Sequence, residues 1–237
     1  MKEKAFYILL LLSALSLAQE KKYFDAPFGG GGGYTPGWIS VNLDELNQQL
    51  IPFGSGQLSK SGFYTSGGAG FIYIGFVPGL RVGGMGFGGS TSESAFLNGF
   101  EREAIYSISG GGFTIEYTFP FIKNVAVSVG TIIGGGGIQI ELYKNAGSFD
   151  WQNLFTEASS TNISRRLNNN FFLLTPTLNV DIPFYRFVSL RIGGGYQLAF
   201  GKTWKAENNK ELFNVPSKLN GNGFFIQTGI FFGFFSY

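Results

Sequence analysis

Apolar and polar residues alternate with a period of two along most of the chain after residue 25. This period predicts β-strands with one apolar face, and clusters of Gly, Pro, Asn and Asp predict turns between them. The predicted strands are residues 26–34, 62–76, 80–90, 104–119, 125–143, 171–182, 188–200 and 223–236. The first is the weakest because Gly29 to Gly33 are consecutive glycines. It is retained because an even number of strands places both termini at the same end of a barrel.

The connections between these strands alternate in length. Three are short and contain a proline: residues 77–79, 120–124 and 183–187. Four are long and polar: residues 35–61, 91–103, 144–170 and 201–222. Short turns at one end and long loops at the other predict an all-β domain, an antiparallel up-and-down transmembrane barrel of about eight strands.

Two local features depart from this plain pattern. In the first long loop, residues 42–50 predict a short helix with Asn42 as its N-cap that ends before Pro52. In the fifth strand, Gln139 and Glu141 fall out of step with the polar face defined by Ser128. The glycines at 134–137 therefore predict a bulge or kink in that strand.

A simple hairpin register separates the strand residues into two faces. It places three pairs of residues opposite each other: Gly75 and Arg81, Glu116 and Ser128, Asn179 and Arg191. The other face is apolar and includes Ile74, Phe76, Leu80, Val82, Ile115, Tyr117, Phe119, Val125, Val127, Val129, Leu178, Val180, Ile182, Val188, Leu190 and Ile192. The apolar face is outside in a transmembrane barrel and inside in a soluble one, so alternation alone leaves both arrangements open.

Four charged residues lie within the predicted strands near the short turns: Arg81, Glu116, Asp181 and Arg191. All four have the parity of the small and polar face. In a transmembrane barrel this face lines the lumen, because a charge facing lipid at mid-depth costs about 2–4 kcal/mol. Two positive and two negative charges at similar height predict a neutral cluster that fills the lumen or gates a narrow pore.

Both ends of the chain indicate export to a membrane. Lys2 and Lys4 precede an uncharged, mainly apolar segment, and Ser16-Leu17-Ala18 suits a signal-peptide cleavage site after Ala18. Residues 1–18 are therefore a predicted signal peptide, and residues 19–237 form the mature domain. The last strand, from Asn222 to Tyr237, is apolar, aromatic and uncharged. In water such a strand would promote aggregation, so it favours the membrane arrangement.

Composition excludes several functions. The 237-residue chain has a formal net charge of +2, and no long basic run indicates binding to nucleic acid. It contains no Cys and no His, which removes thiolate chemistry and the most common general base and metal ligand. We therefore expect no catalytic residue, no cofactor and no metal. The 37 glycines lie mostly within strands, where they suit a narrow barrel better than a phosphate loop.

The loop pattern, the signal peptide, the lumenal charges and the terminal sequence Phe234-Phe235-Ser236-Tyr237 resemble those of small eight-stranded bacterial outer-membrane β-barrel proteins. This resemblance is architectural and implies a location in the cell outer membrane. It also implies contact with outer-membrane lipid and lipopolysaccharide, and recognition of Phe235 and Tyr237 by the barrel-assembly machinery. Barrel enzymes of this membrane use a His, so the resemblance implies no activity here.

Three functions remain open at this point. The chain is expected to be a narrow channel or a route for small or apolar solutes. Alternatively, it is a structural or adhesive surface protein that acts through its loops, or a secreted soluble β-barrel. The three tryptophans, Trp38, Trp151 and Trp204, all fall in predicted long loops. They predict an aromatic belt on the outer side or, less simply, a platform for a ligand.

Overall fold

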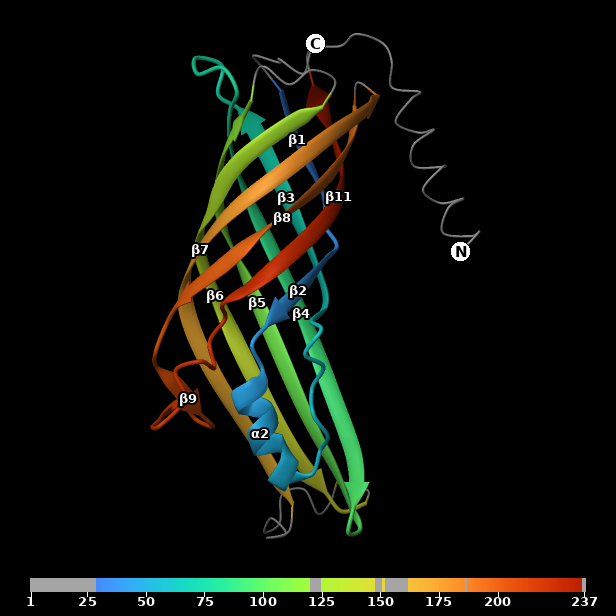
Figure 1. The fold of residues 1–237 in the computed structure, drawn as a ribbon, viewed down its shortest axis with the longest axis vertical. Helices are drawn as coiled ribbons and strands as arrows, with labels where there is room; N and C mark the ends of the chain where they lie inside the picture. Colours follow the sequence, from blue (N-terminus) through green and yellow to red (C-terminus); the bar gives the residue numbers. More distant parts are fainter. Residues whose placement is uncertain (1–28, 120–124, 148–150, 152–161, 186, 236–237) are drawn as a thin grey trace, which may run out of the picture.

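The structure is a computed structural model that describes residues 29–119, 125–147, 151, 162–185 and 187–235. It is a closed antiparallel β-barrel in which some strands extend far beyond the others at one end (Figure 1). The predicted signal peptide, the predicted turn at 120–124 and Tyr237 lie outside the described residues. In the described part of the chain, no helix is long and apolar enough to cross a membrane.

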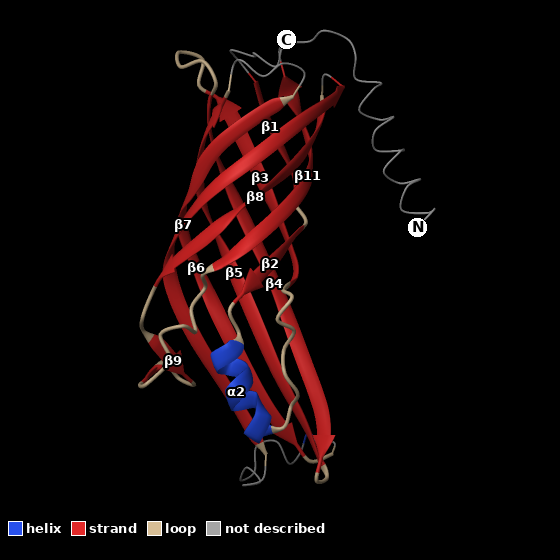
Figure 2. Cartoon of the chain, in the orientation of Figure 1, coloured by secondary structure: helices blue, strands red, loops and turns tan. Residues whose placement is uncertain are grey.

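Eight strands form the ring, and each pairs antiparallel with both neighbours, which confirms the predicted fold class. The first strand consists of two elements in one register, β1 and β2, interrupted at Thr35 and Pro36. The ring elements are β1 (Gly29–Tyr34), β2 (Gly37–Val41), β3 (Phe63–Tyr73), β4 (Leu80–Leu97), β5 (Phe100–Thr118), β6 (Ala126–Asn145), β7 (Ile163–Tyr185), β8 (Val188–Phe200) and β11 (Gly223–Phe235). Figure 2 shows the strands, the helix α2 (Asp44–Phe53) and the loops.

The glycine-rich first strand closes the barrel. β1 pairs with β11 on one side and with β3 on the other, and Gly31 lies opposite both Gly233 and Phe71. A Cβ atom at Gly233 would lie 2.1 Å from the Gly30 carbonyl oxygen, so the two strands approach too closely for a side chain there. The run of glycines is thus a true strand and not a flexible linker.

Two of the predicted long loops contain parts of the ring strands. β4, β5, β6 and β7 contain 18, 19, 20 and 23 residues, about twice the ~10 that a bilayer-spanning strand needs. The predicted loop 91–103 is wrong: β4 and β5 continue to a two-residue turn at Asn98-Gly99, where both φ angles are positive. Asn-Gly is the preferred sequence for such a hairpin turn. The predicted loop 144–170 contains the first part of β7.

The predicted loops 35–61 and 201–222 also contain regular structure. The first includes β2 and α2, and the second includes a small hairpin of β9 (Trp204–Ala206) and β10 (Lys210–Leu212) that pairs with β7. The N-cap of helix α2 is Leu43, one residue later than predicted, although Asn42 still accepts a hydrogen bond from the Asp44 amide. The helix also continues through Pro52 to Phe53, and Gly54 ends it in a left-handed conformation.

The extended strands exchange their apolar and polar faces along their length. Near the short turns, outward positions of β5 are apolar, including Phe113, Ile115 and Tyr117. Farther along the same face lie Ser109, Ser107, Glu103 and Glu101, whereas the inner face there carries the buried apolar residues Ala104, Tyr106 and Ile108. In β7 the apolar outer segment covers residues 172–182, close to the ~9–11 residues of a tilted membrane strand.

This reversal explains why the predicted bulge at 134–137 is wrong. β6 pairs with β5 and with β7 through this segment without any shift in register. Gln139 and Glu141 have the same outward parity as Val127 and Val129, while Ser128 is buried inside. The backbone is regular, and it is the character of the outer-face residues that changes, from apolar to polar.

The predicted hairpin registers are each wrong by two residues. Arg81 lies opposite Tyr73, Ser128 opposite Thr118, and Arg191 opposite Asp181. The first turn is longer than predicted and runs from Ile74 to Gly79, and β7 has an irregularity between Pro183 and Tyr185. A shift of two residues leaves every side chain on its predicted face because the side-chain period is two. The predicted apolar face is therefore outside, as predicted for a membrane barrel, with Ile115, Leu178 and Ile192 exposed.

The glycines of the barrel wall predict a sharp difference between neighbouring positions of β6. A Cβ at Gly134 would lie 2.1 Å from the Gly111 carbonyl oxygen, whereas a Cβ at Gly135 would make ordinary contact, 3.6 Å from the Phe171 carbonyl oxygen. We expect Gly134→Ala to lower the free energy of unfolding by about 1–3 kcal/mol, because the strands must separate to admit the methyl group. Gly135→Ala is the control and should change it by less than about 1 kcal/mol. Urea unfolding in detergent micelles measures both, and equal losses would contradict the close approach.

Candidate functional site in the barrel interior

Four charged side chains form a closed ring inside the barrel near the short turns. Arg81 comes from β4, Glu116 from β5, Asp181 from β7 and Arg191 from β8. Their exposed fractions are 0%, 4%, 2% and 3%. The structure thus places all four of these residues in the lumen and brings them into direct contact; we call them the ion ring.

Each carboxylate of the ion ring lies between both guanidinium groups. Arg81 contacts Glu116 at 2.8 Å and also pairs with Asp181. Arg191 contacts Glu116 at 3.0 Å and Asp181 at 2.6 Å. The positive and negative charges therefore alternate and cancel, which is the arrangement in which burial of charge is tolerated.

Neighbouring side chains complete the coordination of the ion ring. Arg81 donates to the Ser128 hydroxyl, and Asn179 donates to Glu116 at 3.2 Å while accepting from Gln227 at 3.3 Å. The guanidinium groups lie over aromatic rings: Arg81 is 4.7 Å from the centre of the Phe71 ring, and Arg191 is 4.7 Å from that of Phe231. Phe231 is fully buried, so the turn end of the lumen is filled by charge pairs and rings.

The alternation of side chains along the strands predicts that the four residues of the ion ring face inward. It does not predict the ion pairs that form across the barrel. Arg81 and Glu116 are direct cross-strand partners, as are Asp181 and Arg191. The contacts between Arg81 and Asp181 and between Arg191 and Glu116 cross the lumen, where only closure of the ring makes them neighbours. Phe71 and Phe231 could have been found because both have the inward parity at the same height.

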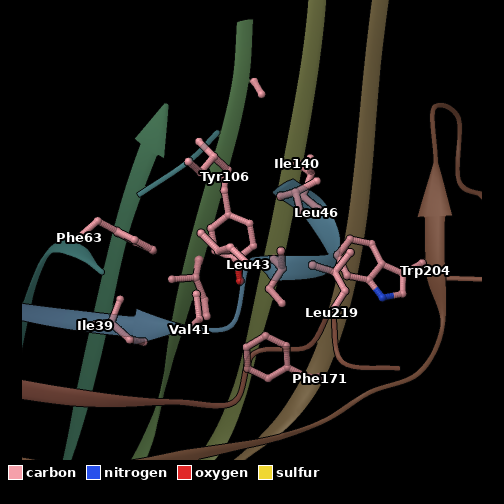
Figure 3. Close-up of a cluster of buried hydrophobic side chains, with 14 of the residues drawn as sticks. Ile39, Val41, Leu43, Leu46, Phe63, Tyr106, Ile140, Phe171, Trp204 and Leu219 are labelled. Carbon is pink, nitrogen blue, oxygen red and sulfur yellow. The ribbon is translucent and has the colours of Figure 1, made fainter. Parts of the chain in front are cut away.

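Beyond the ion ring, the interior becomes apolar. A cavity of about 20 Å³ lies in the middle of the barrel, bordered by Thr and Gln side chains and by Met85, Phe87 and Ile132. On the side of the cavity away from the ion ring lies a large apolar cluster, which Figure 3 shows with Tyr106, Phe171, Trp204, Leu219 and the α2 residue Leu46. Burial raises the pKa of Tyr106, so this phenol remains neutral. We call this apolar region, which is filled by packed side chains and lies between the cavity and α2, the chamber.

The segment 42–58 covers the chamber. Leu43, Leu46, Leu50 and Leu58 are buried against the extended wall. Asn47 secures the segment internally: its amide donates to the Leu58 carbonyl at 2.9 Å and accepts from the Leu58 amide at 2.8 Å. Arg102 of β5 donates to the Phe53 carbonyl and ties the end of α2 to the wall. This segment is the cap of the chamber.

The predicted aromatic set is dispersed. Trp204 is not in an exposed loop but in β9, 3% exposed and part of the apolar cluster, because the β9–β10 hairpin folds over the chamber. Trp38 lies in β2 on the outer wall, and its indole donates to the Ser61 carbonyl at 2.8 Å. Trp151 is exposed beyond β6. Phe235 is the last residue of β11, opposite Gly29. The belt and the assembly signal stay predictions.

The described residues contain no group of three or more His, Cys, Asp or Glu that could hold a metal ion. The ion ring has two carboxylates, but each is already paired with both arginines. It is suited to sealing the lumen and offers no obvious free acid or base.

No protein-family model matches the chain, and no curated protein matches it significantly. Among solved structures, it is similar to a major outer membrane protein from Thermus thermophilus, with 10% sequence identity and a TM-score of 0.51 over 87% of this chain and 99% of that one. Lower scores are found for Ail, the attachment invasion locus protein of Yersinia pestis (9% identity, TM-score 0.43, 87% and 99% coverage), and for CarO2 of Acinetobacter baumannii (13%, 0.33, 85% and 98%). The first similarity establishes the fold, that of a small outer-membrane β-barrel.

The ion ring predicts a large cost for removing one charge. Arg81→Met leaves two carboxylates with a single guanidinium in a buried site, and we expect the free energy of unfolding to fall by about 3–5 kcal/mol. Arg166→Met is the matched control, because Arg166 also pairs with a glutamate at 3.0 Å but is exposed to water, so its loss should have little effect. Urea unfolding of the two variants in micelles gives both values. Similar small losses would mean that the ion ring contributes little to stability.

Proposed function

We propose that this chain is a non-enzymatic outer-membrane β-barrel protein that admits small apolar molecules from its loop end into an apolar chamber. The observation that carries the proposal is the asymmetry of the interior. The chamber under α2 is filled by buried apolar side chains, whereas the turn end is occupied by the ion ring. Such an interior suits an apolar guest better than a hydrated ion.

The outer wall supports a location in the outer membrane. Its apolar belt has the height of a bilayer strand, and exposed residues such as Phe113, Phe172, Ile226 and Phe232 would contact lipid. The Thermus protein with the same fold is described as an outer membrane protein. We propose that the short turns face the periplasm and that the polar outer face of the extension contacts lipopolysaccharide. Phe235 and Tyr237 would then serve recognition by the assembly machinery.

The lack of enzymatic activity is supported by composition. A chain without His or Cys has neither the usual neutral-pH base nor a thiolate nucleophile. The buried carboxylates Glu116 and Asp181 are held by arginines, which favours a structural role.

The proposed entry route depends on displacement of the cap, and Asn47 offers a way to test it. We expect Asn47→Ala to speed uptake of 1-N-phenylnaphthylamine by purified protein in micelles by about 5- to 100-fold, since both hydrogen bonds to Leu58 are lost and each is worth about 0.5–1.5 kcal/mol. Asn42→Ala is the control, because Asn42 is exposed and accepts its hydrogen bond from the Asp44 amide at the exposed start of α2. Fluorescence of the probe on mixing gives the rate and the amount bound.

The same proteins allow the channel alternative to be examined. In planar bilayers we expect no steady ion current from either the native protein or the Asn47→Ala variant, because the ion ring stays in place. An absence of saturable probe binding in both proteins would overturn the proposed route. A steady current that changes when Arg81 is substituted would instead favour the gated channel.

A second candidate function, adhesion, is favoured by the tip of the β4–β5 hairpin. Phe96 is 76% exposed and Leu97 is 43% exposed at the end of the extension farthest from the short turns (Figure 1). Exposed apolar residues at such a site are typical of contact surfaces.

We expect that, if adhesion is the function, Phe96→Ser combined with Leu97→Ser reduces adherence of expressing bacteria to epithelial cells severalfold. The control is Phe213→Ser, which removes a similarly exposed phenylalanine outside this hairpin. Heat-modifiable gel mobility reports that each barrel is folded. Unchanged adherence in the double variant would remove this candidate.

A further inference from the structure

The cavity in the middle of the barrel contains two hydroxyl groups without a partner. Thr35 Oγ1 and Thr175 Oγ1 are buried, border the cavity, and have no hydrogen-bond partner among the described residues. The volume of about 20 Å³ is enough for about one water molecule. The cavity therefore offers two hydroxyl groups in mainly apolar surroundings next to the chamber, which suits one hydrogen-bonding group of a guest.

Both of these threonines precede a proline inside a strand. Proline cannot donate to a sheet and is unusual in the interior of a closed one. Thr35-Pro36 separates β1 from β2, and Thr175 and Pro176 have no cross-strand partner in β8. The barrel wall is thus interrupted at two places beside the cavity.

The interruption at Pro36 has only half of the hydrogen bonding of a regular pair. The Thr228 amide of β11 donates to the Pro36 carbonyl at 2.9 Å. In a regular hydrogen-bonded pair of antiparallel strands, the N–H group of residue 36 would also donate to the Thr228 carbonyl. Pro36 has no N–H group, so this second bond is missing. We call the contact between Thr35–Gly37 and Gln227–Gly229 the seam.

A groove of about 390 Å³ lies on the outer wall directly at the seam. It is bordered by Pro36, Trp38, Tyr64 and Thr228. Three residues, Gly37, Ile226 and Gln227, border both this groove and the inner cavity. The wall between the cavity and the outside is therefore one layer of residues thick at this point, and Gly37 contributes no side chain to it.

From this arrangement we infer that the seam is a lateral portal through which a small, largely apolar molecule with one hydrogen-bonding group, such as a hydroxyl, carbonyl or amine, passes from the interior into the bilayer. This inference rests on the proposed function and adds the route by which the guest molecule leaves the barrel. The polar group of the guest is received by Thr35 and Thr175 at the cavity. The groove then offers an apolar surface at the height of the lipid chains.

The ion ring explains why the exit is lateral. A molecule that continued along the barrel axis would have to separate guanidinium–carboxylate pairs that have no access to water. Opening the seam breaks a contact that already lacks one hydrogen bond. The lateral path is therefore the less costly of the two.

Two variants close the portal in different ways. Pro36→Val supplies the missing N–H group, and Thr228→Trp fills the outer groove from the lipid side without changing the chamber. We expect Pro36→Val to slow uptake of 1-N-phenylnaphthylamine by expressing bacteria by about 2- to 10-fold, the effect of one net hydrogen bond on an equilibrium. Thr228→Trp should also slow uptake, because its indole obstructs the groove. Purified Thr228→Trp protein in micelles should still bind the probe as the native protein does.

The controls apply the same chemistry elsewhere. Pro176→Val changes the other interruption, and none of the residues that border the groove lies on β7. Thr131→Trp places an indole on the outer wall at β6. Both should leave uptake unchanged. Equal slowing by Pro36→Val and Pro176→Val, or no slowing by Pro36→Val and Thr228→Trp, would overturn the portal.

Amide hydrogen exchange in lipid nanodiscs tests the seam without a probe. Exchange in peptides covering residues 37–41 should slow severalfold in Pro36→Val relative to the native protein. An unchanged rate would overturn the portal even if the purified protein binds the probe. If amide exchange slows in Pro36→Val but the purified native protein binds no probe, the proposed function is wrong, whereas the inference that the seam opens is supported.

Discussion

The structure depends on one constraint: four of its strands, β4 to β7, are longer than the apolar belt on the outer wall of the barrel. β4 to β7 keep an unbroken register from the short turns to the far end, so each side chain stays on its face. When the outer face passes from an apolar to an aqueous environment, the residues on it must become polar. The inner face of the extension is then free to carry the apolar residues. That inner face can be stable only if something covers it, and α2 with its flanking segment does so.

This reversal also separates what the sequence could predict from what it could not. A period of two identifies strands and assigns faces whatever their surroundings, so the ion ring was correctly placed inside. Whether an outward-facing position is apolar or polar depends on what surrounds it. The polar residues Gln139 and Glu141 predict a shift in register only if the whole outer face has the same surroundings. The hairpin at Asn98-Gly99 can be predicted from the turn preference of this dipeptide alone. The cap of the chamber cannot be predicted in this way, because Leu43, Leu46 and Leu50 pack against strands that are distant in the sequence.

The first strand illustrates how closure overrides local propensity. Gly29 to Gly33 have no side chains to favour a sheet, and Gly loses more freedom on ordering than other residues. Their backbone groups nevertheless pair with β3 and β11, and the tight approach of Gly30 and Gly233 leaves no room for another residue type. An open edge would expose a row of unpaired backbone groups, which is very costly in lipid. Closure therefore supplies the stability that the local sequence lacks.

Glycine-rich strands specify their register only weakly, because a shift in register breaks few contacts between side chains. A slip of two residues would even keep every face correct, as the three mispredicted hairpins show. The ion ring removes this freedom. Its members come from β4, β5, β7 and β8, and a slip of any one strand would carry its charge about 6–7 Å away from two partners. The cost of a buried unpaired charge then distinguishes the native register from its neighbours. A cluster that contributes modestly to stability as a whole can thus still decide how the wall is assembled.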